Sequence, residues 1–361
     1  MQWHQFDDED VQACRRALES GTLCSIGGTE VPAFEEEFAA EMGAPLAMAI
    51  VNAMAGLHVA VVASGADHGD EVIVDPLVVF ASLGALYHHC TPVFCDVERD
   101  THLMDATKLA EVVTDRTRAI IVTQLWGQCA DMDAINAFAA EHDLLVIEDC
   151  AHAIYATYDG RHAGTLGDVG VYSFQQSKQM ALGDGGMTVM KSEDVRQVMH
   201  EMTTFGTVPA RLGWNYRMNE LVAAVGRVQL TRARQYVEMC RQTAAMFSEA
   251  VEGCGWIVPQ VTRPGRENTY HIWAAVFEGD EHGISEQQFR QVCSEHGLGI
   301  NIGYIERPAY AHEPVARYLD EAPQCPVAEY LMPRLLLLST AGDPSPNSAT
   351  AEKLHAVASA F

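Results

Sequence analysis

Short apolar runs alternate with stretches of helical periodicity between about residues 50 and 190. The runs are nearly continuous in aliphatic residues, which is typical of strands buried on both faces of a parallel sheet. The predicted strands are Glu71–Asp75, Pro92–Cys95, Arg118–Gln124, Leu144–Glu148, Gly170–Phe174 and Met187–Met190. The predicted helices are Met54–Ser64, Ala81–His89, Asp105–Val113 and Met132–His142. This alternation predicts an α/β fold with a mostly parallel central sheet covered by helices.

The flanking sequence predicts further helices and a second domain. Apolar positions recur at helical spacing from about Asn219 to Val251, and a helix of this length often joins two domains. The other predicted elements are a helix at Asp8–Ser20, a glycine loop at Ile26–Thr29, an acidic helix from Val31, a strand at Tyr270–Phe277 and a helix at Ser285–His296. We therefore predict a large domain over residues 1–245 and a small C-terminal α+β domain over residues 246–361.

Composition and charge narrow the possible partners. The chain has 361 residues, of which 48% are hydrophobic and 20% charged, as in folded globular proteins of two domains. Basic residues number 23 and acidic residues 49, so the formal net charge is −26. This charge repels nucleic acids and anionic membranes, and neither is expected as a partner. Because no membrane span or leader peptide is evident, we expect a cytoplasmic protein.

The ten cysteines do not suggest disulfides or a metal site. They are scattered along the chain without a C-x-x-C pair, which is typical of small apolar side chains in a core. The densest group, His88-His89-Cys90 with Cys95, lacks the four converging ligands that a structural metal site needs. No metal is expected.

The run from Leu144 to His152 joins an apolar strand to a carboxylate. Its order, L-L-V-I-E-D-C-A-H, predicts that Asp149 lies at the carboxyl edge of the sheet, where open α/β sheets bind ligands. The next strand leads through Gln175-Gln176-Ser177 to Lys178. The separation between Asp149 and Lys178 leaves room for one strand, so we expect the carboxylate and the amine at the same edge.

Five segments, in order, resemble the DegT/DnrJ/EryC1/StrS family of sugar aminotransferases over nearly the whole chain. They are the Gly-Gly loop at 27–28, E-D-C-A-H at 148–152, S-F-Q-Q-S-K at 173–178, the Gly-Gly strand at 185–186 and N-Y-R-M-N-E at 215–220. A single Gly-Gly pair is more often an ordinary tight turn, so the ordered combination carries the resemblance. It implies a fold type I aminotransferase with pyridoxal 5′-phosphate as cofactor.

The resemblance assigns the catalytic roles to Lys178 and Asp149. Pyridoxal phosphate needs an amine to form an imine, and Lys178 stands at the family's lysine, whose displaced amine also moves the substrate proton. Asp149 matches the carboxylate that keeps the pyridine nitrogen protonated. Phe80 matches the aromatic ring on one face of the cofactor, and His152 matches the group on the other face. Taken alone, Phe80 is more often a core residue and His152 a turn-capping one.

The cofactor phosphate is expected at the N-terminus of the helix that begins near Met54. The family has a threonine hydroxyl where this chain has Met54, which leaves the backbone N–H groups of Ala53 and Met54 and the hydroxyl of Ser173. Asn215 and Arg217 match a segment that crosses the family's dimer interface to the partner's phosphate. The resemblance thus implies a homodimer with shared active sites, and which of these two residues makes the contact stays open.

Local similarities suggest the substrates. F-Q-Q-S-K is similar to the branch that aminates keto-cyclitols such as scyllo-inosose with glutamine, whereas Ile26-Gly27-Gly28 and A-D-M-D at 130–133 are similar to 3-amino-5-hydroxybenzoate synthases. Tyr270-His271 and the segment ending at Tyr304 stand where the family builds substrate-facing loops. Gly27, Gly28 and Tyr304 are therefore candidate substrate residues, although turn structure explains them equally well.

We expect transfer of an amino group from glutamine or glutamate to a ketone of a cyclitol or sugar, in the biosynthesis of an aminoglycoside or aminocyclitol antibiotic or of another secondary metabolite. Three alternatives stay open: a lysine-retaining synthase or dehydratase like 3-amino-5-hydroxybenzoate synthase, a nucleotide-sugar aminotransferase, and a non-catalytic cofactor-binding regulator. Lys178 argues against the dehydratases that lack the lysine. The negative charge counts against a DNA-binding regulator.

Overall fold

The computed structural model describes residues 6–205, 212–303 and 305–361. Within these residues the main sheet has seven strands in the order β1-β9-β8-β5-β4-β2-β3. They are β1 (Leu46–Ile50), β2 (Glu71–Val74), β3 (Thr91–Phe94), β4 (Thr117–Thr123), β5 (Leu145–Asp149), β8 (Val169–Ser173) and β9 (Gly186–Met190). Strand β9 is antiparallel to both neighbours, and the other neighbouring pairs are parallel. The predicted α/β fold with a mostly parallel sheet is confirmed.

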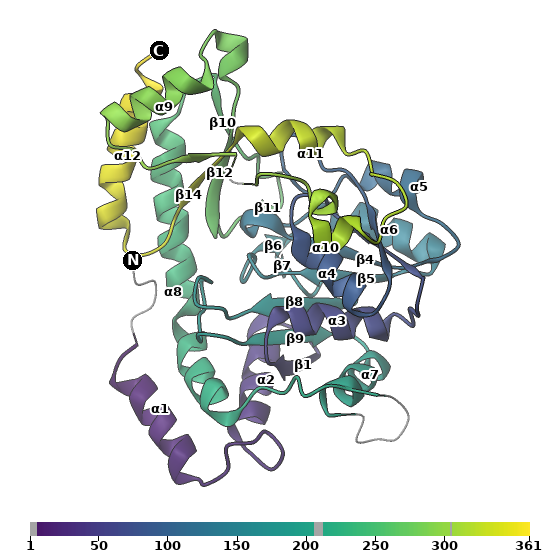
Figure 1. Cartoon of the computed structure of the whole chain (residues 1–361). Coiled ribbons are helices and arrows are strands. Elements are labelled where there is room, and N and C mark those ends of the chain that lie inside the picture. Colours follow the sequence, from purple (N-terminus) through teal and green to yellow (C-terminus); the bar gives the residue numbers. More distant parts are fainter. Residues whose placement is uncertain (1–5, 206–211, 304) are drawn as a thin grey trace.

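Helices cover this sheet (Figure 1). They are α1 (Asp8–Glu19), α2 (Glu30–Met42), α3 (Ala53–Ala63), α4 (Val79–Tyr87), α5 (Leu109–Val112), α6 (Met132–His142), α7 (Glu193–Thr203) and α8 (Glu220–Ala250). Helix α3 lies between α4 and α7 and packs across β5, β8 and β9. Successive residues of β2, β5 and β8 are buried, as expected for strands covered on both faces.

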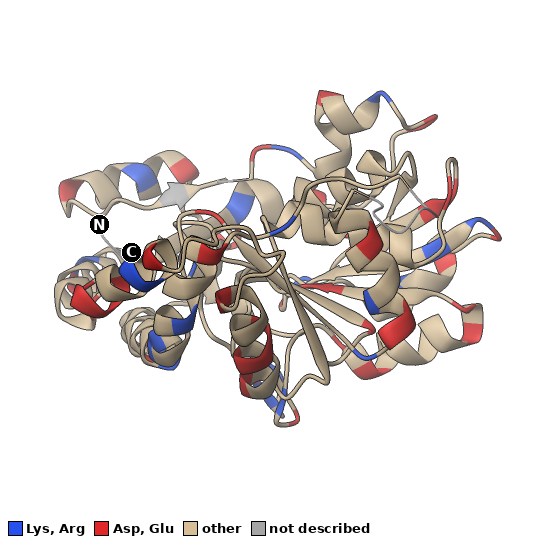
Figure 2. Ribbon diagram, turned by 90° about the horizontal axis from the view of Figure 1, so that it is seen from below, with Lys and Arg blue, Asp and Glu red and all other residues tan. Residues whose placement is uncertain are grey.

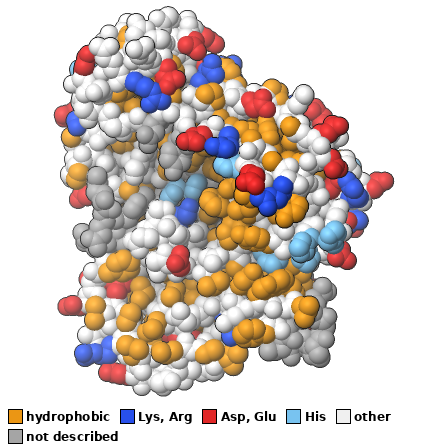
Figure 3. Space-filling model, in the orientation of Figure 1, with side chains coloured by type: hydrophobic (Ala, Val, Ile, Leu, Met, Phe, Trp, Pro, Cys, Tyr) orange, Lys and Arg blue, Asp and Glu red, His pale blue; other side chains and the backbone are white. Residues whose placement is uncertain are grey.

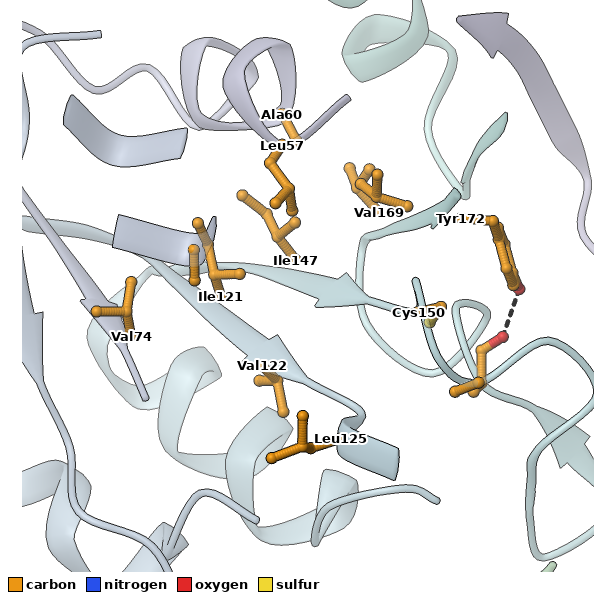
Figure 4. Close-up of a cluster of buried hydrophobic side chains, with 14 of the residues drawn as sticks. Leu57, Ala60, Val74, Ile121, Val122, Leu125, Ile147, Cys150, Val169 and Tyr172 are labelled. Carbon is orange, nitrogen blue, oxygen red and sulfur yellow. Dashed lines mark hydrogen bonds between the residues drawn. The ribbon is translucent and has the colours of Figure 1, made fainter. Parts of the chain in front are cut away.

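Glycine and alanine let α3 approach the sheet closely. Figure 4 shows Leu57 and Ala60 of α3 beside Ile147 of β5. A Cβ atom at Gly56 would lie 2.7 Å from Cγ1 of Val171 on β8, so a larger residue would push the helix away. This close packing fixes the position of the first turn of α3.

The C-terminal part of the described chain forms a second, antiparallel sheet in the order β10-β12-β14-β13. Its elements are β10 (Ile257–Pro259), β12 (Ile272–Phe277), β13 (Asn301–Ile302), β14 (Leu335–Ser339), α9 (Glu286–Glu295), α10 (Glu313–Ala316), α11 (Pro326–Leu331) and α12 (Pro344–Ala358). A small sheet joins β6 (Thr157–Tyr158), β7 (Arg161–His162) and β11 (Arg266–Glu267). Helix α8 runs from α1 and α2 to α12 (Figure 1).

The buried C-terminal residues are divided between two hydrophobic clusters. Ala244 and Phe247 of α8 pack with Trp273 in the smaller cluster. Leu331 and Leu335 belong instead to the larger cluster, which also contains the buried residues of the main sheet and its helices. The boundary between residues 245 and 246 stays a prediction.

Several elements differ from the sequence prediction or were missed by it, and those missed include β10, β14, α11 and α12 in the C-terminal part. Strand β1 and helix α7 were not predicted, and Asp105–Val113 forms a 3₁₀ turn at Ala106–Lys108 followed by the short α5. Strand β12 begins two residues later than predicted, because Tyr270 has a φ of 47°, outside the strand region. The long helix α8 matches its prediction, and Asn219 caps it by accepting a hydrogen bond from the N–H of Val222 at 3.1 Å.

Acidic residues are spread over many helices and loops (Figure 2). In the described ranges no helix has the length and apolar content needed to cross a membrane. The same ranges contain no group of three or more His, Cys, Asp or Glu side chains arranged to hold a metal ion.

Candidate active site

The ends of several strands meet at one edge of the main sheet. Thr123 at the end of β4 lies opposite Asp149 at the end of β5. Because β9 runs the other way, its first residue, Gly186, lies at this edge between Ser173 of β8 and Ile50 of β1. Helix α3 begins just after β1, so its N-terminus is at the same edge.

Asp149 is buried at the end of the central strand β5. Its carboxylate accepts a hydrogen bond from the N–H of Ala151 at 3.1 Å, and its backbone carbonyl accepts one from the N–H of Gln124 at 3.0 Å. Burial raises the pKa of the Asp149 carboxyl, and the positive charge of Lys178 opposes that rise. The charge of Lys178 and the N–H of Ala151 therefore both favour the ionised carboxylate against the effect of burial.

Lys178 lies in the loop between β8 and β9. Its backbone N–H donates to the carbonyl of Gln175 at 2.8 Å, which forms a tight turn. Burial lowers the pKa of the Lys178 amine from 10.5 to about 8, and the charge of Asp149 opposes this shift. The structure thus brings the predicted carboxylate and amine into one buried region.

The neighbouring carboxylate, Glu148, has a different position. It is fully buried and accepts hydrogen bonds from the backbone N–H groups of Gly164, Leu166 and Gly167 and from Nε2 of Gln124, at 2.7–2.9 Å. Successive side chains of a strand point to opposite faces, so Asp149 points away from this cluster. Glu148 therefore stabilises the loop at residues 164–167, whereas the Asp149 carboxylate is available to the candidate active site.

His152 lies in a stack of rings beside Lys178. Its ring centroid is 4.3 Å from that of His271 and 5.7 Å from that of Trp126, with interplanar angles of 30° and 20°. Burial and the nearby Lys178 charge lower the pKa of His152 well below its ordinary value, so the imidazole is neutral. Its Nδ1 is buried and has no hydrogen-bond partner among the described residues.

Phe80 occupies the first turn of α4 and is 54% exposed. The loop before it is held by Asp75, whose carboxylate accepts hydrogen bonds from the N–H groups of Leu77 and Val78 at 2.9 and 3.2 Å. Thr123 donates its hydroxyl to the other oxygen of Asp75 at 2.5 Å. The loop that leads into α4 and Phe80 is therefore tied to the end of β4, which lies beside Asp149.

The N-terminus of α3 offers backbone N–H groups at the same edge. Asn52 caps the helix by accepting from the N–H of Ala55 at 2.9 Å, and the earlier N–H groups of Ala53 and Met54 have no acceptor within a helix. A Cβ atom at Gly186 would lie 2.9–3.0 Å from backbone atoms of Asn52 and Ala53. Glycine thus lets β9 pass beneath the helix end, beside Ser173.

Asn215 and Arg217 lie in a segment that pairs with its own chain. Arg217 forms a bridge with Ile50 at the end of β1, and Asn215 forms one with Thr204 at the end of α7. The guanidinium of Arg217 lies 4.7 Å from the ring centre of Phe205, and its Nη1 is buried without a hydrogen-bond partner in the described part of the chain. The contact with a partner's phosphate stays a prediction.

The substrate role of Gly27, Gly28 and Tyr304 stays a prediction. Gly27 forms a turn with a φ of 82°, and Gly28 packs against the buried carboxylate of Glu220. Tyr304 lies outside the described residues. Sequence reasoning missed Trp126 and Glu220, because their contacts join distant segments and leave no local pattern.

Comparison with known proteins identifies the family. A model described as "DegT/DnrJ/EryC1/StrS aminotransferase family" matches residues 4–360. The chain belongs to this family. This member is a pyridoxal-phosphate-dependent aminotransferase, as the sequence resemblance implied.

Three similar proteins carry different names. The chain is 37% identical over 266 residues to a "Putative L-glutamine:3-amino-2,3-dideoxy-scyllo-inosose aminotransferase" of Micromonospora echinospora, covering 70% of this chain and 62% of that protein. It is 34% identical over 304 residues to a "GDP-perosamine synthase" of Caulobacter vibrioides, covering 82% and 81%. A solved structure of "3-amino-5-hydroxybenzoic acid (AHBA) synthase" has a TM-score of 0.88 at 27% identity, covering 98% and 97%.

The residues at the sheet edge fit the cofactor of this family. A partly buried amine with a lowered pKa suits covalent attachment to an aldehyde, and a buried carboxylate suits a protonated ring nitrogen. The helix end suits a phosphate, and Nδ1 of His152 is a buried polar atom that still needs a partner.

Proposed function

We propose that this aminotransferase moves an amino group from glutamine or glutamate to a ketone of a cyclitol or sugar, in the synthesis of an aminocyclitol or related antibiotic. The observation that carries the proposal is the convergence of Lys178 and Asp149 in one buried region, where each shifts the pKa of the other. The names of the similar proteins support a sugar or cyclitol as the amino acceptor.

In this proposal Lys178 attaches the cofactor and carries the proton. With a pKa of about 8, a substantial fraction of its amine is unprotonated near neutral pH. Nζ can then accept a proton from the substrate carbon as a base and return it as an acid. In an exposed lysine, with a pKa near 10.4, the unprotonated fraction of the amine at the same pH would be far smaller.

Asp149 acts through its charge. Bound pyridoxal phosphate supplies an electron-withdrawing ring that lets the substrate carbon lose a proton. The Asp149 carboxylate, held by the N–H of Ala151 at the end of β5, keeps a proton on the ring nitrogen by attraction. Because the site is buried, this attraction is stronger than it would be in water.

The phosphate and the ring faces have separate contacts. The N–H groups of Ala53 and Met54 and the hydroxyl of Ser173 bind the phosphate at the N-terminus of α3. Phe80 covers one face of the ring, and His152 lies on the other side. His152 stacks on His271, and its buried Nδ1 would be available to hold the cofactor.

A second copy of the chain completes the site in our proposal. Phe80 and Tyr87 lie two turns apart on α4 and are both more than half exposed, and Trp214 and Phe205 continue this apolar surface. Figure 3 shows hydrophobic side chains gathered over α3 and α4. Such a patch favours a protein interface next to the active site. Asn215 lies beside it and is proposed, with Arg217, to reach the partner's phosphate.

The similar proteins leave two enzymatic alternatives to the cyclitol acceptor. One is a nucleotide-sugar aminotransferase, favoured by the likeness to a GDP-perosamine synthase. The other is a lysine-retaining synthase, favoured by the likeness to the AHBA synthase structure.

A panel of acceptors tests the proposal. The holoenzyme is first mixed with glutamine or glutamate, and loss of the cofactor's visible absorption band reports the donor half of the reaction. Keto-cyclitols and nucleotide keto-sugars are then added separately, and a cyclic ketone precursor of an aromatic amine is tested in parallel for conversion to an aromatic product. We expect the band to return fastest with a keto-cyclitol. Return only with a nucleotide keto-sugar would replace the proposal by the nucleotide-sugar alternative, and formation of an aromatic product from the cyclic ketone would replace it by the synthase.

A further inference from the structure

The segment Asn268–His271 connects the C-terminal part of the chain to both sides of the active site. Thr269 donates its N–H to the carbonyl of Gly127 at 2.8 Å, and its hydroxyl approaches the carbonyls of Gly127 and His152 at 3.2 and 3.4 Å. Its own carbonyl accepts a hydrogen bond from Nε2 of Gln179 at 2.7 Å. Thr269 is therefore bound to the turn after β4, to the His152 loop and to the residue next to Lys178.

Backbone conformation shows how tightly these segments fit. Gly127 has a φ of 118°, and a Cβ atom there would lie 2.7 Å from Oγ1 of Thr269 and from the backbone N of Tyr270. Trp126 and Tyr270, on either side of this contact, both have a positive φ, of 64° and 47°. Such conformations persist in larger residues only where the surrounding structure holds them, and they cluster at functional sites.

This contact places the ring of His271 against His152. The two centroids are 4.3 Å apart, and both imidazoles are close enough to Lys178 for its charge to lower their pKa. His271 is almost fully buried, so its ring covers one side of the region that contains the amine. In the described structure, the titratable groups whose fields couple with the Lys178 amine are Asp149, His152 and His271.

We propose that His271 is a positioning residue, whose ring holds the His152 ring in place and shields the Lys178 amine from water. The role belongs to the planar ring and its packing. The inference rests on the assignment of Lys178 in the proposed function. It means that the C-terminal part helps to form the cofactor site through the hydrogen bond between Thr269 and Gln179, which are 90 residues apart in the sequence.

Covalent uptake of pyridoxal phosphate by the cofactor-free protein tests this inference. Its rate is measured against pH from the appearance of the visible band. The wild-type rate is expected to be half-maximal near pH 8, because burial lowers the pKa of the amine to about 8. In His271→Ala, water reaches the amine, and we expect the profile to move upward by about one unit toward the ordinary lysine value. In His271→Phe, which retains a planar ring, the profile should return to that of the wild type.

Further variants separate this role from a general loss of structure. His282→Ala removes an exposed imidazole from the same part of the chain and should leave the profile unchanged. Thr269→Val keeps the shape of the residue but removes its hydroxyl contacts, and should shift the profile in the same direction as His271→Ala. It serves as the main test if His271→Ala does not fold.

Two results would overturn the inference: a wild-type profile in both His271→Ala and Thr269→Val, or a profile in His271→Phe as displaced as that of His271→Ala. Failure of the Lys178 assignment would look different, because the wild-type protein itself would then form no covalent link at Lys178.

Discussion

Glu220 fills the space in which a side chain at Gly28 would lie. A Cβ atom at Gly28 would be 2.1 Å from the carboxyl carbon of Glu220. This carboxylate accepts hydrogen bonds from the N–H groups of Thr29, Glu30 and Val31 at 2.8, 2.7 and 3.1 Å. The first residue of α8 therefore caps the first turn of α2, and the Gly-Gly loop has a structural reason for its glycine.

Gly28→Ala should destabilise the protein. The new methyl group displaces the Glu220 carboxylate from the end of α2, at a cost of about 1–3 kcal/mol, and the midpoint of thermal unfolding should fall. Gly299→Ala is the matched control, because a Cβ atom there meets nothing within 4 Å. Equal midpoints in the two variants, with a raised KM for the acceptor only in Gly28→Ala, would favour the substrate role that the sequence suggested.

Asp149→Asn and Glu148→Gln should have opposite effects. The amide at 149 cannot hold a proton on the cofactor ring, so we expect covalent uptake of the cofactor to persist and turnover to fall by about a hundredfold or more. The amide at 148 faces three backbone N–H donors with one oxygen, so it should lower the thermal midpoint and spare the turnover of the folded enzyme. Near-normal turnover in Asp149→Asn would make Asp149 a structural residue.

His58 should make stability depend on pH. Burial, aided by the charges of His88 and His89, lowers the pKa of His58 from 6.5 to about 4. Unfolding therefore takes up a proton between these values, and the stabilising effect of the neutral ring, complete above pH 6.5, is lost as the pH falls toward 4. The free energy of unfolding should decline less over this range in His58→Phe than in the wild type. Parallel declines in both would contradict the assignment, and His296→Asn, at an exposed site, controls for general histidine effects.

Shared active sites predict complementation between inactive chains. A Lys178→Ala chain is mixed and re-equilibrated with an Asn215→Ala/Arg217→Ala chain. Half of the dimers are then hybrids with one intact site in two, so about a quarter of wild-type activity should return, given random exchange in a two-fold symmetric dimer. No recovery, with hybrids proved by mass spectrometry, would mean that this segment serves its own chain's site or none.

Local patterns predicted those parts of the fold that depend on neighbouring residues in the chain. Strand β5 was found within one residue, because its buried run is continuous, and α8 because its apolar stripe is long. Strand β1, L-A-M-A-I, was missed, because its alanines and methionine favour helix and its pairing with β9 across the sheet decides its state.

In the candidate active site, too, local features could be predicted from the sequence and long-range contacts could not. Asp149 and Lys178 were predicted from strand ends and from the family resemblance, since both follow regular strands. The contacts of Thr269 with Gly127 and Gln179 join segments about 90 to 140 residues apart, and no periodicity in the sequence marks them. Such long-range contacts arise only when the fold closes.

The most direct test of the account is the identity of the lysine that holds the cofactor. The holoenzyme is reduced with borohydride, digested, and its pyridoxyl-labelled peptide sequenced by mass spectrometry, with Lys178→Ala treated in parallel. We predict label on Lys178 in the wild type and none in the variant, which should keep its fold and bind the cofactor without a covalent link. Stoichiometric label on any other lysine would contradict the assignment of Lys178 and the active site built around it.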